Sequence, residues 1–118
     1  MILDYTDNDS YKLYSFTFLE VRKSQVITHN EQVQLFVGRH HFNNGVVKSY
    51  ITKVTRDLTE MECLLAFGCT KEEALRIIGK QYNSMYPHLM NVDVVVIQQD
   101  LARLKMKFQI QQSSMFHD

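Results

Sequence analysis

Residues 58–86, LTEMECLLAFGCTKEEALRIIGKQYNSMY, contain two helix starts that follow one another with a glycine between them. Thr59 with Glu62, and again Thr70 with Glu73, follow the S/T-x-x-E pattern. In this capping box the hydroxyl accepts from the third helical N–H, and the glutamate reaches back to the N–H of the cap. Gly68 stands where the first helix needs a residue in the left-handed conformation. We therefore expect helices at about residues 59–67 and 70–84.

The sequence on both sides of this pair has the patterns of β-strands. Aromatic and β-branched residues are dense before it, and residues 104–111 alternate between apolar and polar side chains. Asn43-Asn44-Gly45 is typical of a hairpin turn. The strands expected are residues 11–21, 24–28, 32–37, 46–55, 92–98 and 104–111. The order β-β-β-β-α-α-β-β predicts an α+β fold: a small, curled and mostly antiparallel sheet of about five to seven strands, with two helices on one side.

Length and composition are those of a globular domain. Of the 118 residues, 45% are hydrophobic and 22% are charged, which is ordinary for one domain with its own core. We expect a polar lead-in at residues 1–10, a single domain at residues 11–112 and a loose tail at residues 113–118. No apolar run approaches the roughly 18 residues that cross a bilayer, and no signal-peptide pattern occurs, so we expect a cytoplasmic protein with no membrane contact. Cys63 and Cys69 are expected to be free thiols.

The net charge is zero, but the charges are segregated. Residues 11–56 carry seven Lys or Arg against two acids, whereas residues 57–73 carry five acids and one base, Lys71. A basic half can attract an anion, and cationic side chains bind phosphate through charge-assisted hydrogen bonds. The residues that we predict to form such a basic rim, for nucleic acid or a nucleotide, are Arg22, Lys23, Arg39, His40 and Lys48. The alternative is that these cations are solvated groups at strand ends.

No conventional catalytic or metal-binding pattern is present. The sequence has no G-x-S-x-G, no phosphate-binding glycine loop and no cysteine or histidine spacing typical of zinc. His40 and His41 are adjacent, so on a regular strand they point to opposite faces and do not share one ion. We expect no metal and no cofactor, and an enzyme is the less favoured interpretation.

One family resemblance covers roughly residues 11–98. The run VQLFVGR at residues 33–39, followed by a strand that ends ITKV at residues 51–54, is similar to the middle of ASCH domains. FGCTKEEAL at residues 67–75 resembles the family's helix start, and the match continues to the expected strand at 92–98. The resemblance implies a compact PUA-like β-barrel, a fold associated with RNA and modified nucleosides.

Some members of that family hydrolyse acetylcytidine with a lysine, a threonine and a glutamate. Lys23 corresponds to the motif lysine, while Val26 stands in place of the threonine and Phe67 lies near the place of the glutamate. The resemblance therefore implies Lys23 as the one candidate catalytic residue. It does not carry the hydrolase activity with it.

Three functions remain open from the sequence. The first is a small module that binds nucleic acid or a nucleotide through the basic rim, without conventional catalysis. The second is a protein-interaction or inhibitor module, such as a phage or mobile-element accessory protein. The third is an amidohydrolase acting on a modified nucleoside. For assembly we expect a monomer or a weak homodimer, with the strand at residues 104–111 in the interface because edge strands template pairing.

Overall fold

The computed structural model describes the backbone of residues 1–115 and the side-chain surroundings of residues 1–108. The described residues contain five strands, three α-helices and three short 3₁₀ helices (η). In chain order these are β1 (Ile2–Tyr5), η1 (Ser10–Tyr14), β2 (Thr17–Lys23), β3 (Gln32–Val37), β4 (His40–Val54), η2 (Thr55–Asp57), α1 (Glu60–Phe67), α2 (Lys71–Gln81), η3 (Pro87–Leu89), β5 (Asn91–Gln99) and α3 (Leu101–Met115).

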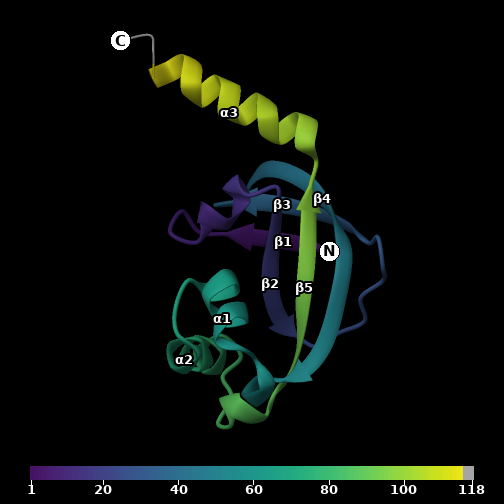
Figure 1. Ribbon diagram of the computed structural model, residues 1–118, viewed down its shortest axis with the longest axis vertical. Helices are drawn as coiled ribbons and strands as arrows, with labels where there is room; N and C mark the ends of the chain where they lie inside the picture. The colour runs from purple at the N-terminus through teal and green to yellow at the C-terminus, as the bar shows by residue number, and fades with distance from the viewer. Residues whose placement is uncertain (116–118) are drawn as a thin grey trace.

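The five strands form one curled sheet in the order β1-β3-β4-β5-β2. All neighbours are antiparallel except β1 and β3, which are parallel. The long strand β4 bends around the sheet and pairs with β3 along its first part and with β5 along its second (Figure 1). The α+β class with a curled, mostly antiparallel sheet is therefore confirmed. The strands at the two edges of the sheet are β1 and β2.

Two hydrophobic clusters hold the sheet in place. One lies inside the curl and includes Leu13, Leu35 and Ile97, while the other lies under the helices and includes Cys63 and Ile78. Strand β5 contributes to both clusters, with Val95 and Ile97 on one face and Val92 and Val94 on the other. A strand buried on both faces has a nearly continuous run of β-branched residues, which explains the sequence VDVVVI.

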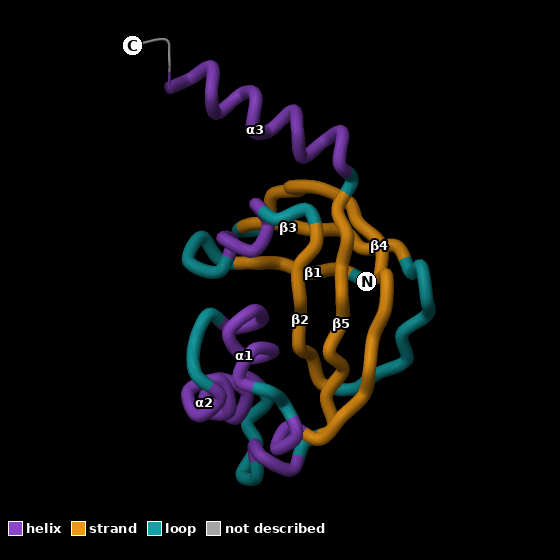
Figure 2. The backbone as a smooth tube through the Cα atoms, viewed as in Figure 1, coloured by secondary structure: helices purple, strands orange, loops and turns teal. Residues whose placement is uncertain are grey.

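The helical pair forms where its capping signals predict it, with a complete capping box at α1 and only the threonine half of one at α2. Thr59 accepts from the backbone of Glu62, and the Glu62 carboxylate accepts from the backbone of Thr59, so the capping box is complete. Gly68 has φ 71°, in the left-handed region. The Thr70 hydroxyl accepts from the Glu73 backbone at the start of α2, which ends at Gln81 rather than at residue 84. Figure 2 shows the two helices together on one side of the sheet.

The C-terminal segment is a helix and not the strand expected at residues 104–111. Asp100 caps the start of α3, since its carboxylate accepts from the Arg103 backbone N–H and its carbonyl accepts from the Leu104 backbone N–H. Leu104 is buried, whereas Met106 is exposed. The apolar residues that alternate in the sequence therefore do not share one buried face, as they would on a strand. The predicted edge strand at residues 104–111 is therefore wrong, and a homodimer contact through this segment stays a prediction. In Figures 1 and 2, α3 leaves the end of β5 and extends away from the sheet.

The hairpin turn is also in a different place. Asn43-Asn44-Gly45 lies inside β4, where a Cβ built on Gly45 would approach the Gln98 carbonyl oxygen to 2.7 Å. The tight turn is Gly38-Arg39, with φ 54° and 70°, as a two-residue turn between twisted strands requires. Gly45 is thus required by a close backbone approach, which the sequence pattern does not distinguish from a turn.

The N-terminal part differs from its prediction in three places. Ile2–Tyr5 is a paired strand of the sheet, not a polar lead-in. Residues 10–14 form η1, so β2 begins only at Thr17, and residues 24–28 form no strand. At the other end, residues 113–115 belong to α3, and the remainder of the predicted tail lies outside the described residues. Within the described chain, no helix is both long enough and apolar enough to cross a bilayer.

Candidate functional site

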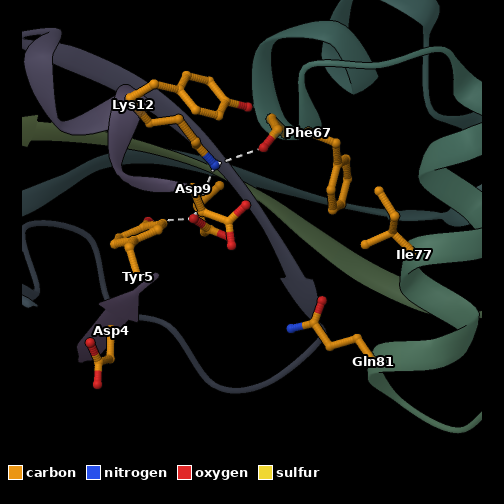
Figure 3. A pocket seen from close by; sticks show the side chains of 10 residues that line it. Asp4, Tyr5, Asp9, Lys12, Phe67, Ile77 and Gln81 are labelled. Atoms are coloured by element: carbon orange, nitrogen blue, oxygen red, sulfur yellow. Dashed lines mark hydrogen bonds and ion pairs between the residues drawn. The ribbon is translucent and has the colours of Figure 1, made fainter. Parts of the chain in front are cut away.

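A buried lysine lies at the centre of a polar site in the fold. Lys12 lies on η1 in the middle of an aromatic-rich segment, and its side chain is only 6% exposed. The Lys12 ammonium donates to Glu20 Oε2 of β2 at 3.1 Å and to the Ala66 carbonyl of α1 at 2.8 Å. Figure 3 shows the Lys12 side chain on the wall of a cavity, with its hydrogen bonds as dashed lines. Because a buried lysine requires compensating partners, the pair fixes η1 against both β2 and α1.

Tyr5 completes a cluster of three side chains. Its hydroxyl donates to the same oxygen of Glu20, in a hydrogen bond across the two edge strands of the sheet. Burial, followed by the charge of Glu20, raises the pKa of Tyr5 far above its ordinary value of 10.0. The phenol therefore stays protonated and acts as a donor. Among the described residues, no donor contacts the second carboxylate oxygen, Glu20 Oε1.

Two buried side-chain amides, Asn43 and Gln99, hold the end of η1, the 3₁₀ helix that carries Lys12. The Gln99 side chain donates to the carbonyls of Leu13 and Ser15, at 2.8 and 2.9 Å, on both sides of the end of η1. Asn43 in turn donates to the Gln99 amide oxygen at 3.0 Å. These bonds satisfy backbone groups that η1 would otherwise bury without partners. The sequence thus folds into a short, rigid support for Lys12.

A cavity of about 250 Å³ lies beside this cluster. It is located at the gap between β1 and β2, with walls from η1, α1 and α2 (Figure 3). Asp4, Asp9 and Glu20 contribute three carboxylates, against one ammonium from Lys12. The aromatic rings that line it include Tyr11 and Phe67, and Gln81 adds a side-chain amide. No group of three or more potential metal ligands occurs in the described part of the chain.

The structure spreads the predicted basic rim along the length of β4 and onto the end of β2. Arg22 and Lys23 lie opposite Asp93 and Val92, level with Thr52 and Lys53 at the end of β4. Arg39 and His40 lie at the turn where β4 begins, and Lys48 lies at the bulge between them. None of the five residues Arg22, Lys23, Arg39, His40 and Lys48 lines the cavity beside Lys12. They do not form one cluster, and phosphate binding by any of them stays a prediction.

Lys23, the candidate catalytic lysine, has an exposed side chain. It lines a separate open cleft with Thr52 and Tyr82, and its backbone N–H donates to the Tyr82 hydroxyl at 3.1 Å. Neither feature places a carboxylate or a second base beside its ammonium.

Sequence reasoning missed Lys12, Tyr5 and Glu20 as site residues. In the strand predicted at residues 11–21, Lys12 would be an ordinary exposed position, and Tyr5 falls in the predicted lead-in. The available signal is a single lysine inside the run YKLYSFTF, where every near neighbour is aromatic, apolar or a hydroxyl. A lone charge in such a run is costly unless it has a buried partner.

Comparison with known proteins adds information on the fold alone. No family model matches the chain, and no curated protein matches it. Among solved structures, the chain is similar to protein EF3133 from Enterococcus faecalis V583, which carries the family description DUF984. The similarity has a TM-score of 0.55 at 9% sequence identity, and it covers 71% of this chain and 65% of that one, less than two thirds of the other protein. The two proteins therefore share a fold.

Proposed function

We propose that the cavity beside Lys12 binds a neutral, flat heterocycle, such as a nucleobase or a nucleoside. The observation that carries this proposal is the buried cluster of Lys12, Glu20 and Tyr5 on the wall of a cavity. Convergent polar groups in a partly apolar cavity are the usual mark of a small-molecule site. The resemblance to ASCH domains supports the same ligand class, because that fold is associated with modified nucleosides.

The hydrogen-bonding groups of the cavity match a heterocycle with adjacent donors and acceptors. An ammonium has three N–H groups, and two of those of Lys12 are used by Glu20 and Ala66, which leaves one for a ligand acceptor. Glu20 Oε1 accepts from a ligand donor. Tyr11 and Phe67 provide aromatic rings against which a planar ring can pack.

Size and charge disfavour a phosphate in this cavity. A volume of about 250 Å³ lies below the roughly 300–1,000 Å³ of sites for drug-sized ligands, so it suits one heterocyclic ring system better than a larger ligand. The three carboxylates and one ammonium of the lining give it a formal charge of −2 (+1 − 3), which repels an anion. The free base or nucleoside is therefore favoured over the nucleotide.

Calorimetric titration with cytidine, adenosine and their 5′-monophosphates tests the proposal. We expect a nucleoside to bind and its monophosphate to bind more weakly. Lys12→Met should weaken nucleoside binding about tenfold or more, because a hydrogen bond to a charged group is lost. Lys48→Met, at an exposed position of β4, is the control and should change nothing. Tighter binding of the monophosphates, with an affinity that falls steeply with salt, would instead support the basic residues as the site.

A second candidate is hydrolysis of an amide on a modified nucleoside, favoured by the placement of a carboxylate and an ammonium on one cavity wall. In such a reaction water adds to the amide carbonyl, the C–N bond breaks, and an acid and an amine leave. Glu20 would take the proton of the water and return it to the leaving nitrogen, and Lys12 would stabilise the developing oxyanion.

Incubation with N4-acetylcytidine, followed by chromatography, tests this second candidate. Production of cytidine that is lost in Glu20→Gln, while acetylcytidine still binds to that variant, would support it. Binding of acetylcytidine to the native protein without any turnover would leave binding alone as the function of the site.

A further inference from the structure

A second hollow adjoins the Lys12 cavity and has a different chemical character. This apolar groove has a volume of about 420 Å³ and lies between α1 and the edge strand β2. It shares Tyr11 and Lys12 with the cavity. Its other lining residues are two hydroxyl side chains and five apolar ones: Ser15, Thr17, Phe18, Leu19, Leu64, Leu65 and Val96. The two hollows are therefore neighbours, with the side chains of Tyr11 and Lys12 lining both.

The groove exposes apolar surface that the fold itself does not cover. Leu64 and Leu65 of α1 are 55% and 51% exposed, although both lie on a groove wall. On the floor, Leu19 of β2 lies opposite Val96 of β5. Lys12 is the one charged residue in the lining, and its ammonium is held by Glu20 and Ala66. What Lys12 presents to the groove is thus the aliphatic part of its side chain.

We propose that the ligand of the Lys12 cavity carries an apolar arm, such as an alkyl chain on the exocyclic nitrogen of its base, and that this arm lies in the groove between α1 and β2. The inference rests on the proposed function, since the polar ring must first occupy the cavity. The shared residues support it: Tyr11, which is half-exposed, and Lys12 line both hollows, and the leucines of α1 lie on the groove side. The preferred ligand class is therefore a base or nucleoside modified with an apolar substituent.

The consequence is a dependence of affinity on arm length. Each methylene transferred from water into an apolar site improves binding by up to about fourfold. Affinity should rise along a series of N4-alkylcytidines, and along the matched N6-alkyladenosines, from methyl through propyl to pentyl. An unsubstituted nucleoside should bind most weakly within its own series. The rise should level off once the arm is longer than the groove.

Two variants separate the ring from the arm. Leu65→Ser should flatten the dependence on arm length and leave the affinity for the unsubstituted nucleoside unchanged. Lys12→Met should weaken every member of the series by a similar factor and keep the slope. Leu89→Ser is the matched control, because Leu89 is 52% exposed but lies on η3 and does not line the groove. Circular dichroism checks that each variant is folded.

The outcomes distinguish the two proposals. If unsubstituted nucleosides bind and arm length has no effect in the native protein, the arm inference is overturned while the proposed function stands. The arm inference is also overturned if Leu65→Ser and Leu89→Ser alter the slope equally. If no member of either series binds, the proposed function fails and the arm inference fails with it.

Discussion

The hydroxyl of Tyr5 donates to the carboxylate of Glu20, and this bond joins β1 to β2. These two strands are the edges of the sheet and do not pair through their backbones. The rings of Tyr5 and Phe18 meet edge to face beside it, with centroids 6.3 Å apart. The curl of the sheet is therefore closed by side chains. The cavity lies where a complete barrel would have backbone hydrogen bonds.

Replacing Tyr5 by phenylalanine should remove the side-chain hydrogen bond between β1 and β2. A hydrogen bond to a charged acceptor is lost, so we expect the free energy of unfolding at pH 7 to fall by about 2 kcal/mol. Urea denaturation measures the change. Tyr50→Phe, at an exposed position of β4, is the control and should leave stability within experimental error. Equal effects of the two substitutions would show that the Tyr5–Glu20 bond does not hold the edges together.

Tyr5 also predicts the behaviour of the protein in alkali. Its folded pKa is raised above the ordinary value of 10.0, so its stabilising contribution is complete below pH 10. That contribution is lost as the pH rises from there toward the folded pKa, because the unfolded phenol ionises first. The stability difference between the native protein and Tyr5→Phe should therefore shrink above pH 10. A difference that grows with pH above that value would contradict the assignment.

Lys12 and Glu20 should be strongly coupled in a double-mutant cycle. Their side chains are 6% and 17% exposed, and removing one charge leaves the other poorly solvated. Lys12→Met alone should destabilise the protein by roughly 3 kcal/mol, whereas Lys12→Met combined with Glu20→Gln should cost less than the sum of the single changes. Urea denaturation of the four proteins gives the coupling. Additive effects would mean that the ion pair is not a unit.

Glu62 of α1 predicts a loss of stability in acid. Burial opposes its ionisation, but the Thr59 backbone N–H and the Lys53 ammonium outweigh burial and lower its pKa below the ordinary value of 4.5. The stabilisation is therefore present above pH 4.5 and is lost as the pH falls through the folded pKa. Glu62→Gln should be less stable than the native protein at pH 7 by about 1 kcal/mol, and the difference should vanish in acid. Glu72→Gln, an exposed glutamate of α2, should show no comparable dependence.

How much of this fold could be predicted depends on how local each signal is. Thr59, Glu62 and Gly68 act within one or two turns of a helix, so their patterns identify α1 before any tertiary contact is known. Gly45 and the Gly38-Arg39 pair show the limit of such signals. Glycine occurs at both places, but for different reasons. Gly38 lies in a turn, whereas Gly45 leaves room for the Gln98 carbonyl of another strand, and the residues next to Gly45 in the sequence do not reveal that contact.

The site was less predictable than the fold because its residues come from distant parts of the chain. Tyr5, Lys12 and Glu20 lie on three different elements, and Ala66 on a fourth supplies the carbonyl. Each side chain has an ordinary interpretation by itself: a lead-in aromatic, an exposed lysine, a strand glutamate. They become a site only because the curled sheet brings its edge strands β1 and β2 close together, and that arrangement depends on the pairing of all five strands. The basic rim was predicted from charges along the sequence, and the sheet spreads those charges from the start of β4, past its bulge, to the end of β2.

The last prediction separates a helix from a strand at residues 104–111. In an alternating strand, Leu104 and Met106 would share one buried face, and truncating either would cost a similar amount. In α3, Leu104 faces the core and Met106 faces solvent, while Phe108 packs against Tyr14 with ring centroids 5.9 Å apart. Leu104→Ala should therefore destabilise the protein by about 2–4 kcal/mol, and Met106→Ala should change stability by less than about 0.5 kcal/mol. Urea denaturation of the two variants decides between the arrangements, since equal losses would favour the strand and a difference of this size requires the helix.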